Sequence, residues 1–362
     1  MTTALLLLIL VITIALVFEF INGFHDSANA IAMVVSTKAL SARYAIIYAA
    51  ILNFCGALFG THVAKTIGEG LVTPDSITQL VILCALLAAV IWNLFTWYLG
   101  FPSSSSHALI GGLLGSAIAH RYCLLDKSYD LILRMPAFQL EHPSLDALNG
   151  HNILHKILIP MVTSPVLGFI VGFIIIIILL KIFYKMRPES LNRLFRKLQL
   201  LSSGFLAFSH GSNDAQKTMG IITLSLITFG YLHDNGEFHI PIWVICACAL
   251  TMSLGTMSGG WKIINTLSSK VVKMKPIHGF SAEVASASLI LCASHFGFPV
   301  STTHIISTAI IGVGSVVKAN AVKWSIVKGI VTAWICTIPI CMALSAGLYM
   351  ILIKTPLANA GV

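Results

Sequence analysis

Apolar stretches long enough to cross a bilayer recur along the whole chain, and short polar segments separate them. A spanning helix needs about 20 predominantly apolar residues. By this criterion the pattern predicts membrane elements at residues 3–37, 43–61, 76–98, 100–119, 153–180, 201–229, 240–260, 277–297, 298–317 and 326–352. The first, fourth, sixth and ninth of these carry polar groups, so we expect broken or re-entrant helices there. The sequence therefore predicts an all-α polytopic membrane protein with about 10–12 membrane segments.

The composition agrees with a membrane protein. Of the 362 residues, 57% are hydrophobic and only 10% are charged, whereas soluble domains carry about 25% charged residues. The eight cysteines form no C-x-x-C pair and lie mostly in apolar segments, so we interpret them as small core residues.

The charged residues are sorted between alternate loops. Lysine and arginine are concentrated in the loops after the first, fifth, seventh and ninth elements, and the other loops hold most of the acids. Because basic loops stay in the cytoplasm, we expect Lys38 and Lys273 inside and Asp130 and Asp234 outside. Both termini are then outside, and the protein is a multi-pass protein of the inner (plasma) membrane. The net charge of +9 indicates topology and not a nucleic-acid partner.

Three short motifs occur twice, in the same order. The pairs are GFHDSANA (23–30) with GSNDAQKT (211–218), FPSSSSHALIGG (101–112) with FPVSTTHIISTA (298–309), and TSP (163–165) with TIP (337–339). Each half of the chain contains five predicted elements, so the second copy would cross the membrane in the opposite direction. Inverted repeats of this kind are typical of secondary transporters.

We therefore expect one inverted repeat at residues 1–182 and another at 201–362. The basic segment 183–200 joins them on the cytoplasmic side. Its amphipathic pattern predicts a helix on the inner leaflet, and a solvated linker is the alternative.

The first repeated motif places acids and amides inside membrane elements. Gly23 and Gly211 would let each helix unwind, and Asp26 and Asp214 would offer carboxylates to a cation or carry a proton. The amides that accompany them are Asn22, Asn29 and Asn213. The alternative is that these groups only cap broken helix ends. Two such motifs related by inversion favour an ion site.

The second repeated motif is a hydroxyl cluster at a helix start, after Pro102 and Pro299. Its members are Ser104, Ser105, Ser106, Ser301, Thr302 and Thr303, followed in each copy by His107 or His304. A helix N-terminus with free N–H groups binds anions such as phosphate or carboxylate. Ordinary N-capping needs only one hydroxyl. The histidines could orient the hydroxyls, respond to pH or be purely structural.

Paired anion cradles and paired acid sites indicate a symporter in which a cation neutralises an oxyanion. The chain has no G-x-x-x-x-G-K-[ST] motif, so an ion gradient must drive transport. The alternatives are transport of another tetrahedral oxyanion such as sulfate, a cation channel or exchanger, and an intramembrane serine hydrolase using His107. Duplicated clusters argue against a single activated nucleophile. We therefore expect no enzyme and no cofactor.

These motifs resemble those of the PiT inorganic phosphate transporter family. NGFHDSANA and SHGSNDAQK are similar to its duplicated G-A-N-D-V-A-N-A signature, and FPSSSSH and FPVSTTH to its P-x-S-x-[ST]-H segments. The resemblance implies symport of inorganic phosphate, free or as a metal–phosphate complex, with protons or sodium. It assigns ion coupling to Asp26, Asn29, Asn213 and Asp214, and phosphate binding to the six hydroxyl residues. A homo-oligomer is compatible with it.

The chain departs from the signature at two positions. His25 replaces an asparagine in the first copy, and Lys217 replaces one in the second. The lysine could neutralise Asp214 or contact phosphate, and it removes a sodium ligand. Both changes favour proton coupling, and we include both residues in the ion-coupling group. A sodium ion at Asp26, Asn29 and Asp214 is the alternative.

Overall fold

The computed structural model describes residues 3–70, 76–126, 150–232, 238–266, 274–317 and 322–357, and within these ranges it contains helices and no strand. The all-α prediction is confirmed. Among the described residues, five helices are long and apolar enough to span a membrane, or six if the bent pair α2 and α3 counts as one span. Asp130, Asp234 and Lys273, whose sides of the membrane were predicted, lie outside the described residues.

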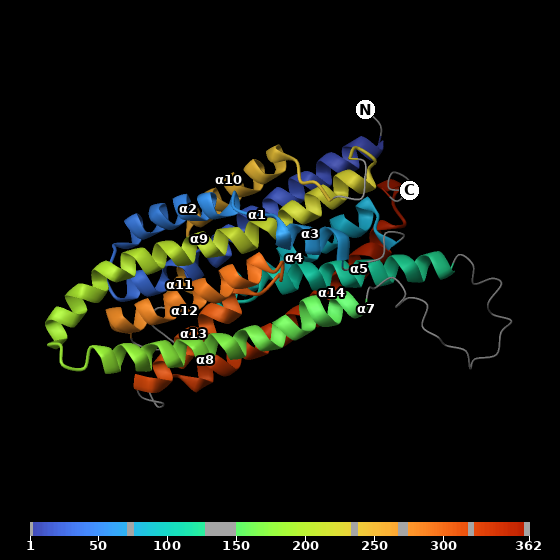
Figure 1. Cartoon of the computed structure of the whole chain (residues 1–362). Coiled ribbons are helices and arrows are strands. Elements are labelled where there is room, and N and C mark those ends of the chain that lie inside the picture. Colours follow the sequence, from blue (N-terminus) through green and yellow to red (C-terminus); the bar gives the residue numbers. More distant parts are fainter. Residues whose placement is uncertain are drawn as a thin grey trace.

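The helices form one elongated bundle (Figure 1). The first part of the chain forms α1 (Thr3–Ser36), α2 (Ala42–Ala57), α3 (His62–Gly70), α4 (Gln79–Leu99), α5 (Ser105–Asp126), α7 (Gly150–Asn152), a π-helical turn (Ile153–Leu158) and α8 (Ile159–Ile182). The second part forms α9 (Pro188–Thr228), α10 (Ile242–Ser258), α11 (Trp261–Asn265), α12 (Pro276–His295), α13 (Thr302–Val317) and α14 (Trp324–Leu352).

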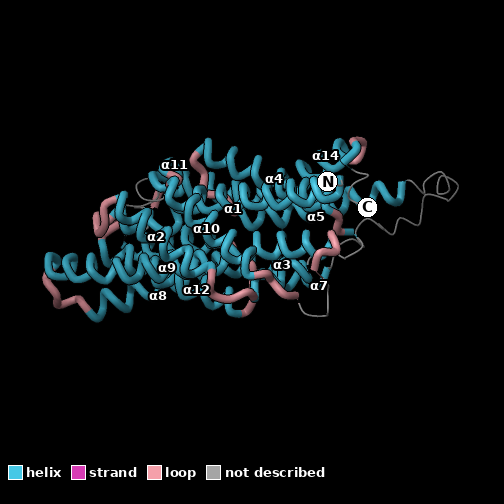
Figure 2. Tube along the Cα trace, turned by 90° about the horizontal axis from the view of Figure 1, so that it is seen from above, coloured by secondary structure: helices cyan, strands magenta, loops and turns pink. Residues whose placement is uncertain are grey.

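The start of α1 and the end of α14 lie at one end of the bundle, and the turn between α8 and α9 lies at the other, in both Figure 1 and Figure 2. This arrangement suits termini on one side of a membrane and a central connection on the other. Residues 188–200 of the predicted linker form the first turns of α9, where Phe195 and Gln199 are buried.

The helices of the two halves correspond in order and in packing. α1 packs against α10 while α9 packs against α2, and α5 packs along α14 while α13 packs along α8. Each contact thus has a counterpart in which the two halves exchange roles. This reciprocity is the pattern expected of two copies related by a pseudo-twofold axis, so it supports the predicted repeats.

The predicted break in α1 and α9 is wrong, because both helices run without interruption through Gly23 and Gly211. A Cβ atom on Gly23 would overlap the carbonyl oxygen of Met252 in α10, and one on Gly211 would overlap that of Asn53 in α2. The glycines are therefore needed for close helix crossing and not for unwinding.

The real interruptions lie elsewhere. Gly100 ends α4 and Gly297 follows the end of α12, both with positive φ, and short non-helical segments then lead to the starts of α5 and α13. The elements predicted as broken at 100–119 and 298–317 are thus single helices that begin inside the protein. The element predicted at 43–61 ends in a break, with an angle of 68° between α2 and α3.

The close crossing of α9 and α2 generates a stability prediction. Gly211→Ala should lower the apparent melting temperature, because a methyl group cannot enter the contact without moving a backbone; overpacking of this kind costs about 1–3 kcal/mol. The matched control is Gly347→Ala in α14, where nothing lies within 4 Å of the added atom and where alanine should stabilise the helix by about 0.8–1.0 kcal/mol. Equal melting temperatures for the two variants in detergent would contradict the packing role.

Candidate functional site

The middle of α1 and the middle of α9 each carry a stripe of buried polar side chains. These are Asn22, His25, Asp26 and Asn29 in α1 and His210, Asn213, Asp214 and Lys217 in α9, all 3% exposed or less. Their spacing of three and four residues places each set on one helix face. Keeping a charge at this depth costs about 2.5–3.5 kcal/mol unless it has a partner or a wet cavity, so the stripe points to a functional site.

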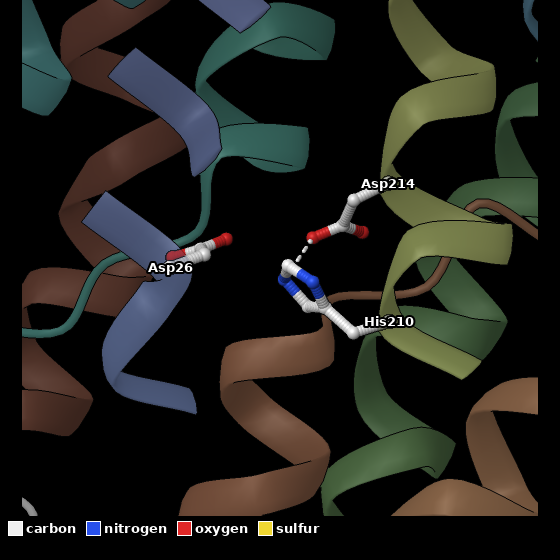
Figure 3. Close-up of side chains that lie close together, drawn as sticks. All are labelled: Asp26, His210 and Asp214. Carbon is white, nitrogen blue, oxygen red and sulfur yellow. Dashed lines mark ion pairs between the residues drawn. The ribbon is translucent and has the colours of Figure 1, made fainter. Parts of the chain in front are cut away.

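The two stripes meet at three groups that could hold a cation. Ligand atoms of Asp26, His210 and Asp214 all lie within 4.8 Å of one another. In Figure 3 the carboxylate of Asp26 extends from α1 toward the other two, which both come from α9. His210 Nε2 lies 3.1 Å from Asp214 Oδ2, and its Nδ1 lies 3.1 Å from Asn53 Oδ1.

His210 was not among the residues that the sequence singled out. The signal was present, since position 210 is the counterpart of Asn22 under the same shift that pairs Asp26 with Asp214. Within the stripes, His25 Nδ1 lies 2.9 Å from Asp26 Oδ1.

Two of the six predicted hydroxyls cap their helices. Ser104 Oγ accepts the backbone N–H of His107 at 3.2 Å, and Ser301 Oγ accepts that of His304 at 3.3 Å. These are the N-cap contacts that the capping alternative predicts. The other four hydroxyls are therefore the stronger candidates for contact with a ligand.

Three of those four, Thr302, Thr303 and Ser106, contact the polar stripes of α1 and α9. Thr302 Oγ1 donates to Asp214 Oδ2 at 2.9 Å, and Thr303 Oγ1 donates to Asp26 Oδ1 at 3.3 Å while it accepts from Asn29 Nδ2 at 2.8 Å. The anion cradle and the ion-coupling motif, which the sequence presents as separate, are thus one hydrogen-bonded network.

Lys217 joins the network from the other side. Its ammonium group donates to Asp214 Oδ1, to Ser106 Oγ, and to the carbonyl oxygen of Val300 at 3.0 Å. The lysine neutralises Asp214 directly, which is one of the two roles that the sequence suggested for it.

Some buried polar atoms of the network have no partner among the described residues. They are Ser105 Oγ, Asn29 Oδ1 and Asn213 Oδ1. Buried polar groups are nearly always hydrogen-bonded, so unpaired ones at a single place point to a ligand. Asn213 Nδ2 does have a partner, Ser294 Oγ at 2.8 Å.

The starts of α5 and α13 lie close together in the interior. The rings of His107 and His304, each in the first turn of its helix, have centroids 4.7 Å apart. Each N-terminus presents free N–H groups and a positive dipole end, so both contribute positive potential to the same region. His304 also packs against the Trp334 ring at 4.0 Å, which supports a structural role for this histidine.

A cavity of about 550 Å³ lies between α3, α9 and α12, and its polar lining includes His62, Ser212, Gln216 and Ser294. Ser294 is the residue that holds Asn213, so the cavity ends beside the network.

The equivalent place in the other half carries two aromatic side chains. Phe24 and Trp97, the counterparts of Ser212 and Ser294, have ring centroids 5.0 Å apart. Lys262 Nζ lies 5.0 Å from the Trp97 ring centroid and 3.3 Å from the carbonyl oxygen of Tyr98. In the described residues, a cavity therefore lies at one of the two equivalent places, and a pair of packed aromatic rings lies at the other.

Two further buried acids lie on the same helices or next to them. Glu19 accepts a hydrogen bond from Thr218, and its Oε1 has no partner among the described residues. Glu283 in α12 accepts from Ser202 at 2.5 Å and from Gln199 at 3.1 Å, so its two oxygens are bonded within the protein.

Comparison with known proteins shows the family of the chain. The family model described as "Phosphate transporter family" matches residues 22–345. The chain belongs to this phosphate transporter family. The match includes both polar stripes and both hydroxyl clusters, and the expected family is confirmed.

Relatives of this family member cover nearly its whole length. A Bacillus subtilis (strain 168) protein named "Probable low-affinity inorganic phosphate transporter" is 45% identical over 97% of this chain and 99% of its own. One of the same name from Rhizobium meliloti (strain 1021) is 41% identical over 96% of this chain and 97% of its own. The solved structure "The sodium-dependent phosphate transporter" shares the fold, with a TM-score of 0.83, 24% identity, and coverage of 96% of this chain and 98% of that one.

Proposed function

We propose that this phosphate transporter family member is a secondary active symporter that imports inorganic phosphate across the plasma membrane, driven by a gradient of protons or sodium ions. One observation carries the proposal: the N-termini of α5 and α13 meet at a buried network that contains Asp26, Asp214 and unpaired polar atoms. The names of its relatives agree with this substrate.

The helix ends supply what a small oxyanion needs. Backbone N–H groups at the first turns of α5 and α13, together with Ser105, Ser106, Thr302 and Thr303, are donors without formal charge. They would bind phosphate by hydrogen bonds and dipoles and could still release it, because no arginine lies in this network among the described residues. Its occupancy accounts for the unpaired Ser105 Oγ.

The acids explain why phosphate needs a co-transported cation. A phosphate near the carboxylate of Asp26 would be repelled, and in a buried site two unit charges 4 Å apart interact by about 4 kcal/mol at an effective dielectric constant of 20. A cation held by Asp26, with oxygen from Asn29 and nitrogen from His210, removes this repulsion. Phosphate and the driving ion therefore bind together, and a neutral metal–phosphate complex would satisfy the same condition.

The two equivalent places suit alternating access. Because the repeats are inverted, the cavity at His62 and Ser294 and the aromatic pair Phe24 and Trp97 would face opposite sides of the membrane. Exchange of the two arrangements would move the network from one side to the other.

Uptake of radiolabelled phosphate into proteoliposomes tests the proposal. We expect accumulation that requires an imposed proton or sodium gradient, that unlabelled phosphate suppresses, and that an equal concentration of sulfate does not. A magnesium chelator distinguishes free phosphate from a metal–phosphate complex. Equal competition by sulfate, or cation flux without phosphate uptake, would contradict the proposed substrate.

Ser105→Ala should weaken phosphate binding without weakening the fold, because the hydroxyl has no partner within the described protein. The loss should be about 0.5–1.5 kcal/mol for one hydrogen bond, and up to ~3 kcal/mol because phosphate is charged. Ser116→Ala on the same helix removes a hydroxyl bonded to Val81, so it should lower the melting temperature and leave phosphate affinity unchanged. Reversal of these two results would remove Ser105 from the site.

Asp26→Asn should abolish gradient-driven accumulation and leave phosphate binding measurable, because the amide keeps the shape but cannot hold the driving ion. Net uptake and counterflow of labelled phosphate separate the two effects, since counterflow requires no coupling. Glu189→Gln, an exposed acid at the start of α9, is the matched control. If the Asp26→Asn protein accumulates phosphate with unchanged pH and sodium dependence, Asp26 is structural and Glu19 becomes the next candidate.

A further inference from the structure

One position of the network carries a different residue in each repeat. The shift that pairs Asp26 with Asp214 also pairs Asn29 with Lys217. In both halves this side chain crosses to the first-turn hydroxyl of the opposite helix end, Asn29 to Thr303 at 2.8 Å and Lys217 to Ser106. These two hydroxyl residues are themselves counterparts, so the geometry is shared and only the charge differs.

The Lys217 ammonium group sits among oxygens as a metal cation would. Its neighbours are a carboxylate oxygen of Asp214, the hydroxyl of Ser106 and the carbonyl oxygen of Val300. The residue is 3% exposed, and an ammonium group is a compact point charge. It therefore supplies one positive charge at a position surrounded by the oxygen ligands typical of hard cations.

The same contacts argue against a direct bond from Lys217 to phosphate. An ammonium group has three N–H donors, and three oxygens already receive them. A direct bond to phosphate would require the ammonium group to give up one of these three contacts, one of which is to the buried Asp214 carboxylate.

At the position equivalent to Lys217, the first half carries Asn29, which has no charge. Among the described residues, the ion pair that Asp26 forms is with His25, at 2.9 Å, and neither lysine nor arginine reaches it. The other described group near Asp26 that can carry a positive charge is His210, in the three-residue cluster with Asp214. Asn29 Oδ1 is buried without a partner, so this half keeps an oxygen free for a mobile cation.

We propose that the Lys217 ammonium group is a tethered cation that permanently fills the cation position of the second repeat, so that this chain moves one coupling cation fewer per phosphate than it would with asparagine at both positions. The statement about phosphate rests on the proposed function. The statement about the cation position does not, because cation binding is measurable without phosphate.

Lys217→Asn tests the inference, since it installs the residue that the first repeat carries. With sodium chloride as the probe and phosphate absent, calorimetric titration of the purified protein should show one more sodium ion bound per chain than in the native protein. Phosphate affinity should then depend on sodium: it should fall by about tenfold or more at low sodium, equivalent to ~1.4 kcal/mol, and recover at saturating sodium.

Three variants make the result specific. Lys217→Arg keeps the charge and should bind no additional sodium. Lys197→Asn removes an exposed lysine from the same helix and should match the native protein in sodium and phosphate binding. Asn29→Lys makes the reciprocal change and should remove the cation dependence of phosphate binding, which gives a second test if Lys217→Asn does not yield a monodisperse protein.

The inference is overturned if Lys217→Asn binds no additional sodium and loses phosphate affinity equally at every sodium concentration, because Lys217 would then be a phosphate ligand. An Asn29→Lys protein whose phosphate binding keeps its native cation dependence also overturns it. Failure of the native protein to transport phosphate would instead remove the proposed function and leave the sodium count as an independent result.

Discussion

The rest of the structure depends on the burial of charge in an apolar interior. Asp26 and Asp214 lie at the centre of a bundle whose outer faces are hydrocarbon-like, where an uncompensated carboxylate is strongly unfavourable. Asp214 is compensated within the chain by Lys217 and His210. Among the described residues, the partners of Asp26 are His25 and the hydroxyl of Thr303. Asp26 is therefore the carboxylate that a mobile cation would stabilise.

The helices that carry the acids are rigid and closely packed. Gly23 and Gly211 allow α1 and α9 to approach α10 and α2 more closely than any side chain would permit. Both acid helices therefore remain continuous, and in the proposed function they would bind the cation through side chains and not through main-chain atoms. In the proposed function, main-chain groups at the starts of α5 and α13 would bind the anion instead. The two kinds of ligand thus come from two kinds of element, and hydroxyls in the first turns connect them.

The two halves share an architecture and differ in the residues that matter for transport. Lys217 in the second half replaces the Asn29 of the first half. Ser105 lacks the bond to a carboxylate that its counterpart Thr302 makes. Phe24 and Trp97 occupy the positions that Ser212 and Ser294, which line the cavity, occupy in the other half. A fully symmetrical protein would present identical sites to both sides, whereas in the proposed function these differences would give the halves separate roles.

The sequence alone determined the class of the protein and most of the residues of the candidate site. Apolar stretches of about 20 residues predict membrane helices, because each backbone polar group in lipid must be hydrogen-bonded within the protein. The duplicated motifs pointed to Asp26, Asp214 and the hydroxyl clusters. The tertiary structure decided what these residues do with one another. Sequence alone could not show that Gly211 serves a helix crossing, that Ser104 is only a cap, or that His210 belongs beside Asp26. Each of these depends on a partner far away in the chain, and local pattern carries no information about which distant surface a helix face will meet.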